Sequence, residues 1–264
     1  MKPATGVALF MKAILAAAFC LLALMLPAQA GDPPLRMGVE GAYPPFNFVD
    51  SAGKVEGFDV DIGEALCARL ARQCEWVVVP WDGLIPALQA GKFDVLMSSM
   101  TITAERSRQV LFTKPYYFSY GMMIANKGSG LTFTTEGLKG HTVGVQAATT
   151  HEAWLRDKFG DAIELHAYPS SDDMFLDFQN GRLDAVFAEA PAMVPWMEAN
   201  GGVKAYEQIG GNITDPALGT EIGIAVRKDD TELVTRLNAA LDGIVADKTF
   251  ATIAKKYFSF QLRP

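Results

Sequence analysis

Apolar positions in the first half of the chain alternate between short continuous runs and longer stretches with a helical period. Short apolar runs predict buried strands, and apolar positions three and four residues apart predict one face of a helix. The predicted order is a strand at 35–39, a helix at 57–70, a strand at 75–79, a helix opening at 84–88, a strand at 94–97 and a polar loop at 98–103. This βαβαβ order is typical of a parallel sheet with helices on its faces.

The same alternation returns in the second half of the chain. It predicts strands at 142–145, 164–167, 184–187 and 223–226, and helices at 149–159, 171–180, 230–247 and 249–258. Two α/β units followed by a late strand and helices predict two lobes joined by extended crossovers near 116–125 and 216–223. We therefore expect a first lobe at 31–119, a second lobe at 120–216, and a return to the first lobe at 217–264.

The N-terminal 30 residues have the pattern of a secretory signal peptide. Lys2 and Lys12 precede an apolar run at 13–26, and a small-x-small cleavage pattern occupies 27–30. A membrane anchor is the alternative, but the run is shorter than the ~20 residues of a membrane-spanning helix. We expect export, with cleavage near Ala30.

The charge balance is acidic. The chain has 23 basic and 30 acidic residues. Removing a leader with two lysines and no acidic residue leaves 21 basic against 30 acidic side chains, a net charge of −9. This excludes a nucleic-acid binder that works by neutralising phosphates, and it weakly favours a cationic ligand through steering.

Two cysteines, Cys67 and Cys74, remain after the leader. In an oxidising compartment this pair predicts a disulfide that closes a short loop, with two buried free thiols as the alternative. His141, His151 and His166 lack the spacing of metal ligands, so we predict no metal site and no cofactor. We expect His151 to be a partly exposed helix residue.

Polar and aromatic residues follow the predicted strands, where ligands of open α/β sheets bind. These residues are Glu40, Tyr43, Phe46, Ser98, Ser99, Met100, Thr101, Arg106, Gln146, Thr149, Thr150 and Glu189. A ligand held there meets one guanidinium, amides at helix starts, hydroxyls, aromatic faces and two carboxylates. The chain shows neither a Ser-His-Asp or Cys-His arrangement nor a phosphate loop, so we predict a binding protein rather than an enzyme.

Several ordered segments resemble the polar amino-acid binding proteins of bacterial ABC importers, such as the lysine-arginine-ornithine and histidine binding proteins. The resemblance covers essentially all of the mature chain. It rests on the segments 40–46 (EGAYPPF), 57–61 (GFDVD), 81–88 (WDGLIPAL), 98–106 and 112–117 (FTKPYY), and on 144–145, 149–150, 180–185 (NGRLDA) and 255–258 (KKYF). The cysteine pair also matches a disulfide common in basic amino-acid binders.

The resemblance implies how the polar ends of an amino acid are held. Arg106 is similar to the clamp for the α-carboxylate, with the backbone N–H groups of Thr101 and Thr150 as its partners. Glu189, with the hydroxyls of Ser99 and Thr101, matches the site of the α-ammonium. Relatives often carry Asp at the position of Glu189, which is one methylene longer, and this difference bears on the identity of the ligand.

The resemblance also implies how the ligand side chain is held. Tyr43 and Trp81 match the aromatic pair around its aliphatic stem, and Glu40 faces its cationic tip. Ser98 contributes through its carbonyl, and Thr149 lies beside Thr150 at the start of the predicted helix.

At the level of the whole chain, the resemblance implies a type II periplasmic-binding-protein fold, in which each lobe is a mainly parallel sheet flanked by helices. It implies a periplasmic monomer that binds a small, basic amino acid (arginine, ornithine, lysine or histidine) and delivers it to an inner-membrane ABC permease. The alternatives are a binder of opines or other polar amino-acid derivatives, a sensor that presents its ligand to a receptor, and a cyclohexadienyl-type dehydratase on the same fold.

Overall fold

The computed structural model describes residues 32–262 of the chain. The predicted signal peptide, residues 1–30, lies outside the described residues. Within the described residues, 34–262 belong to one compact unit. None of the helices within residues 32–262 is long and apolar enough to cross a membrane.

The first sheet has the strand order β5-β1-β6-β14-β7, with β8 also paired to β14. Its strands are β1 (Leu35–Val39), β5 (Cys74–Val78), β6 (Val95–Thr101), β7 (Leu111–Phe112), β8 (Tyr117–Phe118) and β14 (Glu221–Val226). The helices of this part are α2 (Phe58–Arg69), α3 (Leu84–Gln89), α4 (Ala104–Gln109), α9 (Thr231–Ala246) and α10 (Thr249–Tyr257), with a 3-10 turn at Trp81–Gly83. A small sheet of β2 (Ala42–Tyr43), β3 (Asn47–Val49) and β4 (Val55–Glu56) follows β1.

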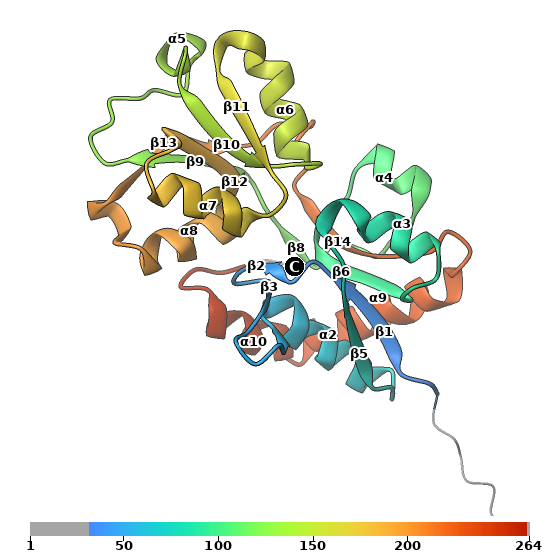
Figure 1. Ribbon diagram of the computed structural model, residues 1–264. Helices are drawn as coiled ribbons and strands as arrows, with labels where there is room; N and C mark the ends of the chain where they lie inside the picture. The colour runs from blue at the N-terminus through green and yellow to red at the C-terminus, as the bar shows by residue number, and fades with distance from the viewer. Residues whose placement is uncertain (1–31, 263–264) are drawn as a thin grey trace, which may run out of the picture. The chain divides into compact units, whose positions relative to one another are not determined.

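The second sheet has the order β11-β10-β12-β9-β13. Its strands are β9 (Gly121–Asn126), β10 (Thr142–Gln146), β11 (Glu164–Tyr168), β12 (Ala185–Glu189) and β13 (Tyr206–Ile213). Its helices are α5 (Thr135–Leu138), α6 (Thr150–Phe159), α7 (Ser171–Gln179) and α8 (Ala190–Ala199), with 3-10 turns at Gly160–Ala162 and Gly202–Lys204. Figure 1 shows α6, α7 and α8 around this sheet.

Both sheets are mixed, with a parallel part that matches the predicted βαβαβ units. β1 runs parallel to β5 and β6, and β10 runs parallel to β11 and β12. Two antiparallel strands come directly after the chain crosses from one sheet to the other. The strand β9 pairs with β12, and β14 pairs with β6. The α/β class predicted from the sequence is confirmed, and the antiparallel strands β9 and β14 lie inside their sheets rather than at the edges. The division into lobes at 120 and 216 stays a prediction.

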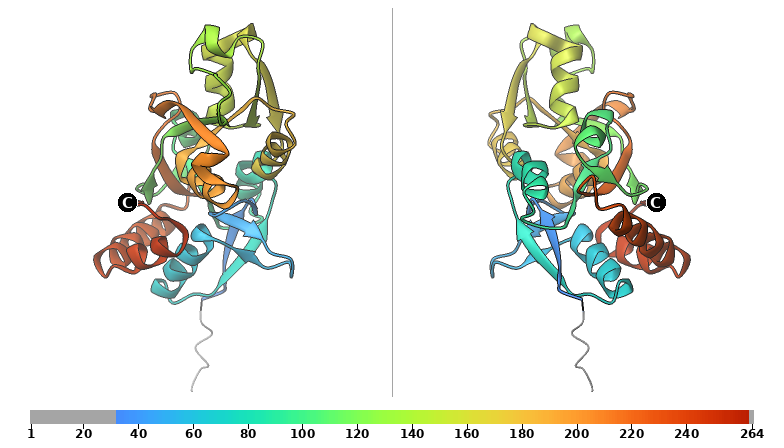
Figure 2. Two further views of the ribbon diagram at one scale, coloured as in Figure 1. Left: turned by 90° about the vertical axis from the view of Figure 1, so that its left-hand side faces the viewer. Right: turned by 90° about the vertical axis from the view of Figure 1, so that its right-hand side faces the viewer.

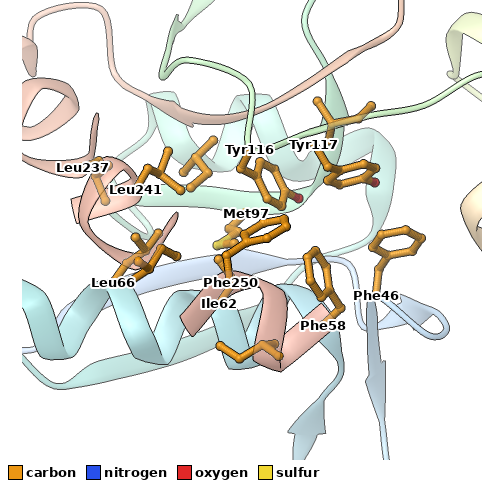
Figure 3. Packing of buried hydrophobic residues seen from close by; sticks show 14 of the residues in the cluster. Phe46, Phe58, Ile62, Leu66, Met97, Tyr116, Tyr117, Leu237, Leu241 and Phe250 are labelled. Carbon is orange, nitrogen blue, oxygen red and sulfur yellow. The ribbon is translucent and has the colours of Figure 1, made fainter. Parts of the chain in front are cut away.

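The core of the first sheet joins segments from both ends of the chain. Figure 3 shows Ile62 and Leu66 of α2 facing Leu237 and Leu241 of α9, with Phe250 beside them. Both views in Figure 2 place the C-terminal helices next to α2. The late helices therefore complete the core on which β1 and β6 rest.

An aromatic cluster extends this core toward the ends of β1 and β6. Phe46 stacks on Tyr117 with ring centroids 5.2 Å apart, and Phe58 meets Tyr116 at 6.4 Å. Tyr43 stacks on Phe46 at 5.5 Å. The rings are buried, so the chain from Tyr43 onward is anchored on a packed base.

Several parts of the structure differ from the predicted elements. The predicted polar loop at 98–103 was wrong for its first four residues, because β6 continues to Thr101 and pairs with β14. The segment β9 is a strand within the predicted crossover, and neither α8 nor β13 was predicted. Pro191 and Pro195 interrupt the helical pattern of α8, and glycines interrupt the apolar pattern of β13.

The predicted disulfide between Cys67 and Cys74 is confirmed, with the two Cα atoms 5.8 Å apart. Cys67 lies in the last turn of α2, and Cys74 is the first residue of β5. The bond therefore fixes the turn that leads from the helix into the edge strand.

Candidate functional site

One cavity gathers all ten predicted ligand-binding residues and Gln146. Its volume is about 20 Å³, little more than one water molecule needs. Its lining consists of Glu40, Tyr43, Trp81, Ser98, Ser99, Thr101, Arg106, Gln146, Thr149, Thr150 and Glu189. The structure thus brings together residues that are up to 149 positions apart in the sequence.

The cavity lies where strands of both sheets end. Glu40 follows β1, Gln146 is the last residue of β10, and Glu189 is the last residue of β12. Since β10 and β12 are parallel neighbours, their carboxyl ends reach the same edge of the second sheet. Strand ends therefore place both carboxylates and the amide.

A bulge in β6 shapes the floor of the cavity. The pairing of β6 with β14 shifts register between Met100 and Leu96, and Ser99 within this stretch has a φ of 49°. A left-handed φ is uncommon for a residue other than glycine and costs on the order of 1–3 kcal/mol. The bulge interrupts the strand alternation at the point where Ser98 and Ser99 line the cavity.

The hydroxyl of Ser99 is tied to a buried carboxylate, Asp59, at 2.9 Å. Asp59 also accepts hydrogen bonds from Asn47 Nδ2 at 2.9 Å and from Tyr116 Oη at 2.7 Å. Burial raises the pKa of Asp59 to about 6, although these three donors favour its ionised form. Because the hydroxyl of Ser99 donates its proton to Asp59, its oxygen can accept a hydrogen bond from a ligand.

Arg106 is partly buried on α4, and its position is fixed from two sides. Nη1 donates to the carbonyl of Thr101 at 3.0 Å, and the guanidinium lies 5.2 Å from the centre of the Trp81 ring. Thr103 caps the helix by accepting the Arg106 backbone N–H at 3.1 Å. Burial lowers the pKa of Arg106, against the opposing effect of Glu189. With one of its five N–H groups used, the side chain retains four donors for an anion.

Glu40 is buried, and its carboxyl contacts the second sheet. Oε1 accepts a hydrogen bond from Gln146 Nε2 at 2.5 Å, and the Glu40 backbone N–H donates to Ser98 Oγ at 3.0 Å. Burial raises the pKa of Glu40 to about 8, the Gln146 hydrogen bond opposes this shift, and Asp172 and Glu189 add to it. A cationic group beside Glu40 would reverse the shift.

Glu189 precedes α8, and its carboxylate accepts a hydrogen bond from the hydroxyl of Tyr43. Its Oε1 lies 3.8 Å from Nδ1 of His151. The prediction that His151 is partly exposed was wrong: it is 5% exposed and packs edge-on against Phe187 at 5.1 Å. Burial lowers the pKa of His151, Glu189 opposes this shift and Arg106 adds to it. The imidazole, on α6, lies beside the carboxylate of Glu189.

The start of α6 supplies backbone donors to the cavity. Thr149 is its N-cap, and its hydroxyl accepts the N–H of Glu152 at 3.1 Å and donates to the Gln146 carbonyl at 2.7 Å. Thr150 is the first residue of the helix, where backbone N–H groups lack helical partners and favour anions. Trp81 Nε1 reaches across to the Ala148 carbonyl at 3.1 Å.

Two residues of this site were not assigned a function from the sequence. Gln146 was noted only as the residue after a strand, and Asp59 only as part of the segment 57–61. The position of Gln146 at a strand end was a usable signal, whereas the contacts of Asp59 come from residues 12 to 57 positions away. Across residues 32–262 no cluster of three or more His, Cys, Asp or Glu side chains is arranged to hold a metal ion.

Known proteins match this chain over most of its length. Residues 35–260 match the family model of bacterial extracellular solute-binding proteins, family 3. The L-arginine-binding protein of Pseudomonas aeruginosa is 40% identical over 253 residues, which cover 95% of this chain and 98% of the relative.

Solved structures agree with this match. A Salmonella typhimurium periplasmic binding protein described for its high arginine specificity has a TM-score of 0.79 at 35% identity, covering 86% of this chain and 100% of the other. An ancestral amino-acid-binding protein, described as a precursor of cyclohexadienyl dehydratase, has a TM-score of 0.77 at 31% identity, covering 86% and 96% of the two chains. Together with the cavity at the strand ends, these matches show that the chain belongs to the bacterial extracellular solute-binding proteins of family 3.

Proposed function

We propose that this protein binds a basic amino acid, arginine foremost, in the cavity at the strand ends. The observation that carries the proposal is the charge of the cavity: one guanidinium, Arg106, and two carboxylates, Glu40 and Glu189. A basic amino acid offers the complement, one carboxylate and two cations. Electrostatic complementarity of this kind sets specificity.

The proposed placement of the ligand backbone follows from the donors around Arg106. Its four remaining N–H groups and the amides of Thr101 and Thr150 receive the α-carboxylate. Glu189 and the oxygen of Ser99 accept hydrogen bonds from the α-ammonium. The hydroxyl of Tyr43 donates a hydrogen bond to Glu189, and the ammonium replaces this donor.

The side chain of the ligand is proposed to run from this group toward Glu40. Tyr43 and Trp81 flank its aliphatic stem, and Glu40 pairs with the cationic tip. Arg106 lies over the ring of Trp81, so the same indole contributes to both ends of the site. Ser98 and Thr149 complete the lining beside these groups.

At the level of the whole protein, we propose export to the periplasm with removal of residues 1–30. The protein is then a monomer with two lobes, one made of residues 31–119 with 217–264 and the other of residues 120–216. The lobes close on the ligand, and the closed protein presents it to an inner-membrane ABC permease. Hydrogen bonds from Tyr43, Trp81 and Gln146 already join residues of 31–119 to residues of 120–216. This supports a closure that brings the sheet edges together.

A thermal-shift panel followed by calorimetry tests the proposal. A ligand at 1,000 times its Kd adds about 4 kcal/mol of stability, which for a chain of this size raises Tm by roughly 10 °C. We expect that rise with arginine, ornithine or lysine. Agmatine, which lacks the α-carboxylate, and glutamate, whose tip repels Glu40, serve as matched controls. Opines belong in the panel as a related ligand class.

We also propose that the protein has no catalytic activity, and the panel tests this against the dehydratase alternative. That alternative is favoured by the likeness to an ancestral precursor of cyclohexadienyl dehydratase and by Glu189, a carboxyl group at the cavity edge. Turnover of prephenate, with no Tm shift from any α-amino acid, would establish the enzyme instead. A shift with arginine and no loss of prephenate supports binding.

A further inference from the structure

Two buried side chains, Glu40 and Gln146, lie in the part of the cavity where the side chain of the ligand is proposed to end. Glu40 is 6% exposed and Gln146 is 8% exposed, so neither carboxyl nor amide has free access to water. Their short hydrogen bond, 2.5 Å from Gln146 Nε2 to Glu40 Oε1, joins the end of β1 to the end of β10.

The amide of Gln146 is held at both ends, which fixes its orientation. Its Oε1 accepts a hydrogen bond from the hydroxyl of Ser171 at 3.0 Å, and Ser171 is itself buried. With the oxygen used, the NH₂ group must face Glu40. One N–H goes to Glu40, and an amide nitrogen carries a second. Gln146 therefore presents donors to the cavity rather than an acceptor.

The charged groups that act on Glu40 are acidic. Asp172 of α7 and Glu189 at the end of β12 both disfavour its ionisation, and the hydroxyl of Tyr43 is close enough to interact. With burial, these groups raise the pKa of Glu40 to about 8 in the absence of a ligand cation. At neutral pH, Glu40 without a cation beside it is therefore mostly protonated, and the acid is a donor as well as an acceptor.

From this geometry we propose that Glu40 and Gln146 recognise two classes of side-chain tip. A guanidinium or ammonium tip is bound by Glu40 as the carboxylate. A neutral urea or amide tip, as in citrulline or glutamine, is bound by Glu40 as the acid, with Gln146 donating to the carbonyl of the tip. This inference rests on the proposed function, because it assumes that the tip of an amino acid reaches Glu40.

The proposal makes the preference between the two classes depend on pH. Glu40 has one pKa in the arginine complex and a higher one in the complex with a neutral ligand. At any pH between these two values, the neutral-ligand complex contains one proton more, on Glu40. The ratio of the two affinities then changes tenfold per pH unit. The ligand-free protein cancels from this ratio, so its own conformation and titration do not matter.

The test measures Kd for arginine and citrulline by calorimetry from pH 5.5 to 7.5. We expect the preference for arginine to rise by up to about 100-fold across these two units. Repeating the titrations in buffers with different ionisation enthalpies should show about one proton more taken up with citrulline than with arginine. A ratio constant within threefold, or arginine binding with no citrulline binding at pH 5.5, overturns the proposal and leaves the proposed function intact. If neither ligand binds, the proposed function itself fails.

Two variants, each with a matched control, test whether Glu40 and Gln146 cause the pH dependence of the preference between arginine and citrulline. Glu40→Gln should make the ratio independent of pH, whereas Glu75→Gln on the exposed edge of β5 should not. Gln146→Leu should weaken citrulline by tenfold or more beyond its effect on arginine, whereas Gln208→Leu on exposed β13 should leave both unchanged. An unaltered pH profile in Glu40→Gln contradicts the proposal. Should that variant not fold, the proton count of the wild-type protein decides.

Discussion

Replacing Arg106 by alanine is the most direct test of how the site holds an amino acid. The guanidinium is partly buried, keeps four N–H donors after its bond to Thr101, and lies over the Trp81 ring. Removing it leaves the α-carboxylate of the ligand buried with only the amides of α6 and Thr101 as partners. Removing one partner of such a buried pair costs about 2–5 kcal/mol of binding free energy. The Kd for arginine should therefore rise thirty-fold to several-thousand-fold.

The comparison of two ligands separates recognition from a general disturbance of the site. Agmatine lacks the α-carboxylate, so Arg106→Ala should weaken it far less than it weakens arginine, and the difference isolates the pair. Arg106→Lys keeps the charge but loses the planar fork, and an intermediate loss is expected. Arg108→Ala, an exposed arginine on the same helix, is the matched control.

Isothermal titration calorimetry of the four proteins with both ligands gives the required affinities. If Arg106→Ala binds arginine within threefold of the wild type, or loses agmatine equally, the carboxylate of the ligand does not lie against Arg106. The assignment of the two ends of the site would then have to be reversed or abandoned.

Two further predictions concern stability. The disulfide closes a loop with a sequence separation of 7. The double variant Cys67→Ser with Cys74→Ser should therefore lower the free energy of unfolding, measured by urea titration, by about 2–3 kcal/mol. An unchanged urea midpoint would contradict this. The pKa of Asp59 is about 6 in the folded protein and ~3.9 in an unfolded chain, so its stabilising contribution is complete below pH ~4 and lost as the pH rises through 6. Relative to Asp59→Asn, wild-type stability should fall by up to about 3 kcal/mol between pH 4 and 7, and a constant difference between the two proteins would refute the assignment.

The sequence predicted the site well because the rule that locates it is local. Strand ends are visible as the point where an apolar run stops, and the polar residues that follow Val39, Val145 and Ala188 all line the cavity. The ordered motifs then supplied Trp81, which neither the periodicity nor the strand ends would have singled out.

The missed features depend on contacts between distant segments. His151 is buried because Phe187, on another strand, covers it, and nothing within α6 indicates this. The segment 98–101 is polar, like a loop, but it is a strand because β14 returns from far along the chain to pair with it. The glutamine at 146 acquires its importance only from Glu40 and Ser171 on other elements.

A hydrogen bond across the cavity, from Tyr43 to Glu189, uses a carboxylate that the ligand also needs. The hydroxyl of Tyr43 donates a hydrogen bond to Glu189, so an incoming α-ammonium displaces this intramolecular partner. The measured Kd equals the intrinsic Kd divided by the fraction of the protein in which this bond is open. This factor is the same for every ligand, so it sets a common concentration threshold without changing their ranking. Substitutions such as Tyr43→Phe would move that threshold for all ligands together.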